Sequence, residues 1–417
     1  MPSKHRGFLR LDDQGRLSLT DDLASAWGLK PGDSLPFRVV DGALHLEPPI
    51  HTVQRVYIEP TNQCNLDCRT CMRNAWAEAP GCMSAETFQH ILNDLRAFAP
   101  LPLVFFGGYG EPLSHPDILR MVREVKAAGA RVELITNGTL LDAPTAAGLV
   151  QAGLDRVWVS LDGATPEGYL DVRLGDLLPR IIGNLERLKE IRQRTGADTP
   201  RLGVAFVAMK RNIHELPEVI RLGKRLGADV FSISNVLAHT AELRDESLYA
   251  RSYYEADMPV SEWSPLVQLP RMELNEWTAP ALAEALKGRV SVQITGQTLT
   301  QGASTCPFLE KRSLSVRWDG SVAACLPLLH RHTGYLQHKP RDAAEHSFGS
   351  VNQRSLDAIW QSEPYRAFRE RLWDFDFSPC VTCNSCELSD SNQEDCFGNL
   401  APTCGGCLWA QGFIRCP

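Results

Sequence analysis

Three cysteines, Cys64, Cys68 and Cys71, lie within eight residues and directly follow the apolar run at 53–58. Such a run predicts a strand that enters a loop. A cubane iron-sulfur cluster normally takes four cysteines, so a loop that supplies three leaves one iron open to a small molecule. Zinc sites, which favour paired C-x2-C elements with four ligands, and ordinary buried thiols are the alternatives. The spacing therefore favours an iron-sulfur cluster with one reactive iron.

A second group of cysteines lies near the end of the chain and predicts a second metal region. An Asp319-Gly320 turn predicts a hairpin with cysteines on both sides. The nine cysteines of this region are Cys306, Cys325, Cys380, Cys383, Cys386, Cys396, Cys404, Cys407 and Cys416. They suffice for two four-cysteine clusters with one thiol left over, and zinc at one site stays open because C-x2-C pairs suit zinc as well.

Length and charge limit the kind of protein. The 417 residues exceed the roughly 250 to 300 at which one core stops growing, which predicts two or three domains. The net charge of -7 argues against a nucleic-acid partner. No signal peptide and no membrane-spanning apolar run are visible, so we expect a cytoplasmic protein with no membrane contact. Cysteines in a reducing compartment favour metal over disulfides.

From position 53 onward, strand patterns alternate with helix patterns. Strands are expected at 53–61, 101–107, 131–137, 156–162, 202–209 and 229–236, and helices at 84–98, 116–128, 143–152, 176–194 and 213–226. Six strands separated by helices predict a parallel sheet with right-handed crossovers. The expected fold class is α/β, with a partial (β/α)6 barrel of the TIM type that is open on one side.

Polar and glycine residues gather at the expected strand ends, where parallel barrels place their functional groups. These candidates are Gly107, Gly108, Glu111, Asn137, Ser160 and Asp162. Glycine lets backbone approach a ligand closely, and a carboxylate beside it can accept an ammonium group. We therefore expect a ligand site at this edge of the sheet.

The loop spacing and the strand-end residues together resemble the radical S-adenosylmethionine (SAM) superfamily. In that superfamily the open iron chelates the amino and carboxylate groups of SAM. The resemblance implies that Gly107, Gly108 and Glu111 match a G-G-E motif that binds the SAM ammonium. It further implies a ribose contact from Asp162, and Arg173 stands where relatives carry an arginine that pairs with the SAM carboxylate.

The cysteine-rich end resembles the SPASM extension of radical SAM maturases, which binds one or two auxiliary four-iron clusters. Cys306 and Cys325 match the opening of its pattern, whereas the later cysteines depart from it. The tail at 394–412 is similar to the SPASM maturases of tungsten-cofactor oxidoreductases such as aldehyde ferredoxin oxidoreductase. We thus expect a SAM-binding cluster, SAM and auxiliary clusters as cofactors.

Four segments are expected along the chain. Residues 1–50 resemble the swapped-hairpin fold of transition-state regulators and antitoxins, with a docking or dimerisation role favoured over DNA binding and a solubilising β cap as the alternative. Residues 51–240 would form the partial barrel and 241–300 a linker or substrate region. Residues 301–417 would form the auxiliary iron-sulfur domain.

The expected function is a radical SAM maturase that modifies a protein, peptide or cofactor precursor, with Cys64, Cys68 and Cys71 as the catalytic ligands. Its partners would be that substrate, which we expect to be a tungsten oxidoreductase or its small companion peptide, and a one-electron donor such as ferredoxin or flavodoxin. A ribosomal-peptide cyclase that makes thioether or carbon-carbon links is the alternative enzyme. A non-catalytic iron-sulfur scaffold or regulator is the alternative of another class.

Overall fold

The computed structural model describes residues 52–249 except 77 and residues 306–417 except 337–338, 379 and 381–385. Short segments between 10 and 50 and between 266 and 294 are described as well. Cys383, one of the expected metal ligands, lies outside the described residues.

The six expected strands form one continuous parallel run, in which each strand pairs with the next along the chain. They are β5 (Arg55–Ile58), β6 (Leu103–Phe106), β7 (Val132–Thr136), β8 (Arg156–Ser160), β9 (Arg201–Ala208) and β10 (Ala228–Asn235). The prediction of a parallel α/β sheet is therefore confirmed.

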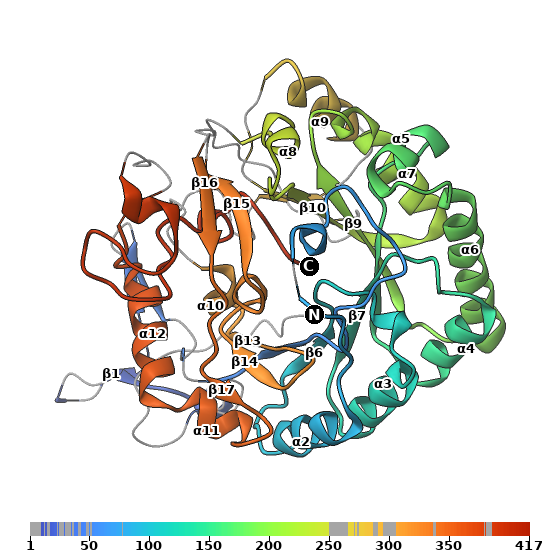
Figure 1. Ribbon diagram of the computed structural model, residues 1–417. Helices are drawn as coiled ribbons and strands as arrows, with labels where there is room; N and C mark the ends of the chain where they lie inside the picture. The colour runs from blue at the N-terminus through green and yellow to red at the C-terminus, as the bar shows by residue number, and fades with distance from the viewer. Residues whose placement is uncertain are drawn as a thin grey trace.

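Helices follow the strands and cover the outer face of the sheet (Figure 1). They are α2 (Ala85–Leu95), α3 (Ile118–Ala127), α4 (Ala143–Gln151), α5 (Pro166–Arg173), α6 (Leu178–Thr195) and α7 (Leu216–Leu226). Ser84 caps the first of these by accepting from the Thr87 N–H, and α6 and α7 end at left-handed Gly196 and Gly227. In the part of the chain that the structure describes, no helix is long and apolar enough to cross a membrane.

The sheet continues past β10 into the region expected to be a linker. Strands β11 (Leu266–Leu269) and β12 (Ser291–Ile294) add to it in parallel, and helices α8 (Ala241–Asp245) and α9 (Thr278–Leu286) accompany them. Sequence reasoning predicted neither strand. The equally short β5 and β6 were predicted because each lies in a longer apolar run, at 53–61 and 101–107.

The C-terminal region joins the other edge of the same sheet. After α10 (Pro307–Glu310), strand β13 (Ser313–Val316) pairs in parallel with β5. The expected hairpin then forms as β13 and β14 (Ser321–Ala323) pair antiparallel, and Gly320 takes a positive φ of 90° in the turn. The first cysteines of this region are therefore attached directly to the barrel sheet.

The remaining C-terminal elements pack beside this hairpin, on the left in Figure 1. They are β15 (His332–Leu336), β16 (Lys339–Ala343), β17 (Gly349–Ser350), α11 (Leu356–Trp360) and α12 (Glu363–Asp374). Strands β15 and β16 form a separate antiparallel pair, whereas β17 extends the main sheet beyond β14.

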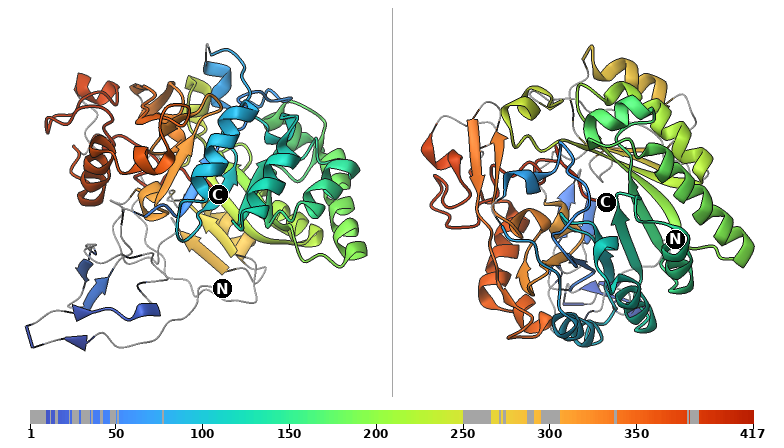
Figure 2. Two further views of the ribbon diagram at one scale, coloured as in Figure 1. Left: turned by 90° about the horizontal axis from the view of Figure 1, so that it is seen from below. Right: turned by 45° about the vertical axis from the view of Figure 1, so that its right-hand side comes forward.

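Near the N-terminus, two short antiparallel pairs form sheets of their own. Strand β1 (Arg10–Leu11) pairs with β2 (Leu17–Ser18), and β3 (Phe37–Val40) pairs with β4 (Ala43–Leu46). None of these four strands belongs to the eleven-stranded sheet, and Figure 2 shows them beside it rather than within it.

The shared sheet predicts that the barrel depends on the C-terminal region. A chain that ends at residue 305 lacks β13 and leaves the edge of β5 unpaired, so it should aggregate, because an open apolar edge strand is a template for association. A chain that starts at residue 51 is the control and should stay soluble. Size-exclusion chromatography checks both, and a monodisperse, folded 1–305 chain would contradict the prediction.

Candidate active site

The loop after β5 carries Cys64, Cys68 and Cys71 and is held by its own hydrogen bonds. The Cys71 N–H donates to the Cys68 carbonyl at 3.0 Å, and the Asn74 side-chain amide donates to the same oxygen at 3.1 Å. The Arg73 guanidinium donates to the Leu66 carbonyl at 3.2 Å. A short 3-10 helix, η1 (Met72–Ala75), ends the loop. The backbone thus fixes where the three thiols stand.

Neighbouring donors point at two of the thiols. The sulfur of Cys64 accepts from the Leu66 N–H at 3.4 Å and from the Asn137 amide at 3.8 Å. The sulfur of Cys68 accepts from Arg173 Nη1 at 3.5 Å. Burial raises the pKa of the Cys64 and Cys71 thiols, so metal ligation must displace their protons.

Glu111, after β6, is buried and ties two strand ends together. Its carboxylate accepts from the Thr136 hydroxyl at 2.7 Å, from the Asn137 N–H at 2.7 Å and from the Leu113 N–H at 3.0 Å. Burial raises the pKa of this carboxyl, although these hydrogen bonds favour its charged form. Glu111 therefore positions Asn137, which in turn reaches Cys64.

The glycines before Glu111 bring the backbone close to the end of β5. Gly108 has a φ of 142°, and a Cβ there would lie 2.6 Å from Glu59 Cγ. A Cβ on Gly107 would lie 2.6 Å from the ring of Phe105. Gly110 is equally confined, because its Cβ would overlap the carbonyl oxygen of Thr61. The segment 107–110 has no room for side chains at these three positions.

Asp162 and Arg173 form a buried ion pair on the other side of the loop. Arg173 Nη2 lies 2.6 Å from Asp162 Oδ2, and the Asp162 side chain is fully buried. The same carboxylate accepts from the Val207 N–H at 2.8 Å. Arg173 Nε finds no hydrogen-bond partner among the residues that the structure describes. Ser160 closes β8 two residues before Asp162.

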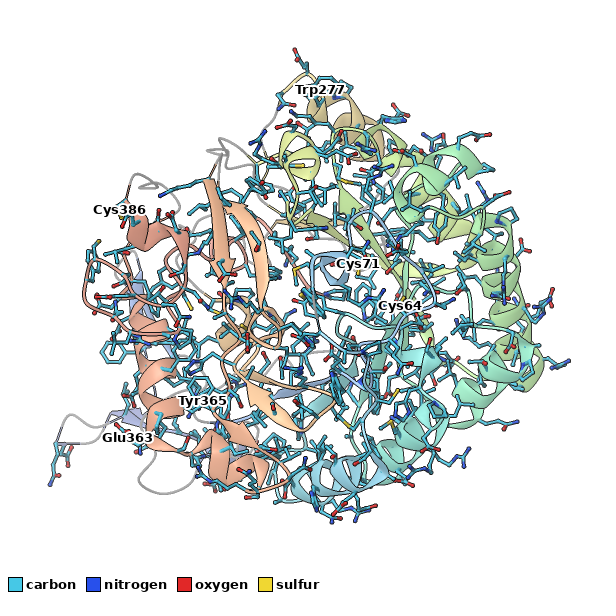
Figure 3. The ribbon with its side chains drawn as sticks, viewed as in Figure 1. Cys64, Cys71, Trp277, Glu363, Tyr365 and Cys386 are labelled. Carbon is cyan, nitrogen blue, oxygen red and sulfur yellow. The ribbon has the colours of Figure 1, made fainter. Side chains whose placement is uncertain are left out.

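The structure thus brings the predicted residues into two groups around the loop. Asn137 and Glu111 lie on the Cys64 side, and Asp162 and Arg173 lie on the Cys68 side. An Arg173 nitrogen that has no partner among the described residues, on a guanidinium that contacts the Cys68 thiol, fits an anionic group bound to a cluster there. Figure 3 shows Cys64 and Cys71 near the middle of the molecule.

The C-terminal cysteines divide into buried and exposed ones. Cys306, Cys325, Cys404 and Cys407 line one enclosed cavity. Cys416 is partly buried, and burial raises its pKa. The Cys380 sulfur lies 3.1 Å from the Ser378 hydroxyl. Cys386 and Cys396 are exposed, and Figure 3 shows Cys386 at the outer edge, far from Cys64 and Cys71.

Within the described ranges, no three His, Cys, Asp or Glu side chains converge on one metal ion. A cubane spreads its thiolates over different irons, so its ligands need more room than those of a single zinc ion. By the chemistry of their donors, the three-cysteine loop and the four cysteines of the cavity suit iron-sulfur clusters, which take thiolate ligands.

Sequence reasoning missed a buried network between the loop and the C-terminal region. His330 Nε2 lies 2.8 Å from Glu59 and its Nδ1 lies 2.8 Å from Glu78, and the ring of Trp76 stacks on the imidazole at 4.1 Å. The Tyr109 N–H donates to Glu59 at 3.1 Å. Only Glu59 carried a signal, because it directly follows β5 as Glu111 follows β6.

Comparisons with known proteins agree with this geometry. Residues 58–233 match the Radical SAM superfamily, and residues 306–387 match the iron-sulfur cluster-binding SPASM domain. A tungsten-containing aldehyde ferredoxin oxidoreductase cofactor-modifying protein of Pyrococcus furiosus is 32% identical over 87% of this chain and 96% of its own length. A PqqA peptide cyclase of Rhodopseudomonas palustris is 26% identical over 79% of this chain and 78% of its own length.

Among solved structures, Streptococcus suis SuiB bound to S-adenosylmethionine is similar in fold, with a TM-score of 0.53 at 15% identity. The match covers 82% of this chain and 72% of SuiB. The chain belongs to the radical SAM superfamily, in the branch that carries a SPASM domain. It is therefore an enzyme that uses a SAM-binding four-iron cluster, SAM and auxiliary clusters.

The buried ion pair gives a stability prediction. Arg173→Met leaves the Asp162 charge buried without its partner and should cost about 3–5 kcal/mol. Adding Asp162→Asn should restore part of that loss. Arg120→Met, which breaks two solvent-accessible pairs with Asp117 and Glu124 at α3, should cost about 0–1 kcal/mol for each pair. Urea unfolding of the cluster-free protein measures all three, and equal losses for Arg173→Met and Arg120→Met would refute the prediction.

The His330 network predicts a pH-dependent contribution to stability. Burial opposes charging of His330, but the hydrogen bonds and charges of Glu59 and Glu78 outweigh it and raise the pKa of the imidazole. Its stabilisation is then complete below the unfolded pKa of about 6.5 and is lost as pH rises through the higher folded pKa. The difference in melting temperature between the parent and His330→Gln should shrink from pH 6 to pH 9. A difference that grows with pH is the opposite result.

Proposed function

We propose that this enzyme is a maturase that modifies a protein, peptide or cofactor precursor for a tungsten-containing oxidoreductase. The supporting relative covers nearly the whole chain and is named as a modifier of such a cofactor. The observation that carries the proposal is the placement of two thiol sites about one strand. The three-thiol loop follows β5, and the four-cysteine cavity is joined to β5 through β13.

The residues around the cluster loop have separate roles in this proposal. Cys64, Cys68 and Cys71 would hold the cluster, which with bound SAM would supply a 5′-deoxyadenosyl radical able to remove a hydrogen atom from the substrate. Gly107 and Gly108 would let the backbone approach SAM, and Glu111 orients the Asn137 strand end. Arg173 would pair with the SAM carboxylate through its Nε, which has no partner among the described residues, while Asp162 holds the guanidinium in place.

The comparisons with relatives support a macromolecular substrate. The relatives include a PqqA peptide cyclase, which supports a peptide or protein as the substrate class. The one-electron donor would be a ferredoxin or flavodoxin, and the N-terminal unit at 1–50 would dock the partner. The rival functions predict other outcomes. A peptide cyclase would release a cross-linked peptide, and a non-catalytic scaffold would bind clusters without cleaving SAM.

The test compares two single cysteine variants under anaerobic, reducing conditions. Cys68→Ala removes one of three loop ligands and should reduce 5′-deoxyadenosine formation to background, as measured by chromatography. Cys82→Ala is the matched control, because Cys82 is exposed and lies outside the loop. It should keep the parental rate of SAM cleavage.

A substrate trial then separates the candidate functions. The oxidoreductase or peptide that co-purifies with the enzyme is incubated with SAM, and its mass is measured. A modified oxidoreductase, companion peptide or cofactor supports the proposal, and a cross-linked precursor peptide unrelated to any oxidoreductase supports the cyclase. A parent protein that binds clusters but never cleaves SAM would leave only the scaffold.

A further inference from the structure

Helix α12 buries two polar side chains beside the C-terminal cysteines. Tyr365 and Arg369 lie four residues apart and so occupy the same face of the helix. Each is only 1% exposed. Both line the cavity that Cys306, Cys325, Cys404 and Cys407 also line. Figure 3 shows Tyr365 beside α12, on the side toward the rest of the molecule.

These two side chains carry buried donors without a partner among the described residues. Arg369 Nη1 donates to the Trp360 carbonyl at 2.8 Å. Arg369 Nε and Nη2 and the Tyr365 hydroxyl find no partner within the described part of the chain. Buried polar groups are nearly always hydrogen-bonded, because leaving one unpaired costs about 1–3 kcal/mol and a charged one costs more. Their persistence here points to an acceptor inside the cavity.

The charge of Arg369 is also poorly compensated by its surroundings. Its guanidinium carbon stacks 3.8 Å from the ring centre of Trp360 and 4.8 Å from that of Tyr365. Aromatic faces attract a cation but do not replace a carboxylate. Burial lowers the pKa of Arg369 to about 10, which reports a charge held in an apolar setting. An anion in the cavity would offset that cost.

The four cysteines that line the cavity would supply such an anion as metal ligands, because a cysteine binds metal as its thiolate. Four thiolates around a cubane give a net negative group with sulfur acceptors on its faces. Such a group would accept hydrogen bonds from Tyr365 and Arg369 and would offset the buried positive charge of Arg369.

We propose that Cys306, Cys325, Cys404 and Cys407 hold one auxiliary four-iron cluster, and that Tyr365 and Arg369 donate hydrogen bonds to its sulfur atoms. The inference rests on the proposed function and assigns one of its sites. Reduction adds one negative charge to the cluster, and a fixed cation in a dry cavity stabilises that charge. Arg369 is thus a positioning residue. It makes the reduction potential of this cluster higher than it would be without the hydrogen bond and charge of Arg369.

The test is a redox titration of the reconstituted holoenzyme followed by electron paramagnetic resonance. Auxiliary signals are those that do not change when SAM is added. In Arg369→Met, the equilibrium constant for one-electron reduction of one auxiliary cluster should fall at least tenfold. That fall shifts its reduction potential by about 59 mV to more negative values. Arg369→Lys, which keeps the charge, should recover most of the shift. Arg366→Met, on the exposed face of α12, is the matched control and should leave all potentials unchanged.

A second variant guards against failed folding or loading. Tyr365→Phe removes one hydroxyl without changing the packing, and it should lower the same couple by a smaller amount. Iron content and circular dichroism are measured for every variant. If Arg369→Met does not load iron fully, Tyr365→Phe alone decides the matter.

An unchanged auxiliary potential in fully loaded Arg369→Met, or in Tyr365→Phe when it alone decides, would overturn the inference. SAM cleavage is measured on the same samples to separate this failure from failure of the proposed function. Intact SAM cleavage and product formation with an unchanged potential would sink the donor role only. A parent enzyme that makes no product would instead contradict the proposed function, whatever the potentials are.

Discussion

The pairing of β5 with β6 on one edge and with β13 on the other positions most of the chemistry in this protein. The cluster loop leaves the end of β5, and the glycines and Glu111 follow β6. The hairpin that begins with β13 carries Cys325 just beyond its second strand. Backbone hydrogen bonds in one sheet therefore fix the SAM site relative to the C-terminal cysteines, and neither region needs a flexible linker to find the other.

Burial also holds the charged side chains of the site in place, and it lowers the stability of the protein without its cofactors. Glu111, Asp162, Arg173 and Arg369 are almost fully shielded from water, and burial raises the pKa of the Cys64, Cys71 and Cys306 thiols. Arg173 and Arg369 each keep a nitrogen with no hydrogen-bond partner among the residues that the structure describes. Such an interior is less stable without its cofactors than with them, so cluster binding and folding are expected to be coupled. The same low dielectric strengthens each contact to a bound cluster or ligand.

Local spacing allowed the barrel and the loop to be predicted, because Cys64 to Cys71 and the strand ends depend on neighbours in the chain. The four-residue strands β11 and β12 were not predicted, whereas the equally short β5 and β6 were, because each of those lies in a longer apolar run that leads into a motif. His330 could not be paired with Glu59 from sequence, since 271 residues separate them. The sequence predicted a helix at Tyr365 and Arg369 but not that these two side chains would line a cavity with four cysteines. Contacts between distant segments carry no periodic signal.

The central claim is that the loop holds a cluster with one iron open to SAM. Electron-nuclear double resonance of the reduced enzyme, with SAM labelled at its amino nitrogen and carboxylate carbon, tests that claim most directly. We predict hyperfine couplings from both labels that are strong enough to require direct bonding to the cluster. Tight binding of labelled SAM with no coupling from either label would contradict it, because SAM would then lie near the loop without occupying the open iron.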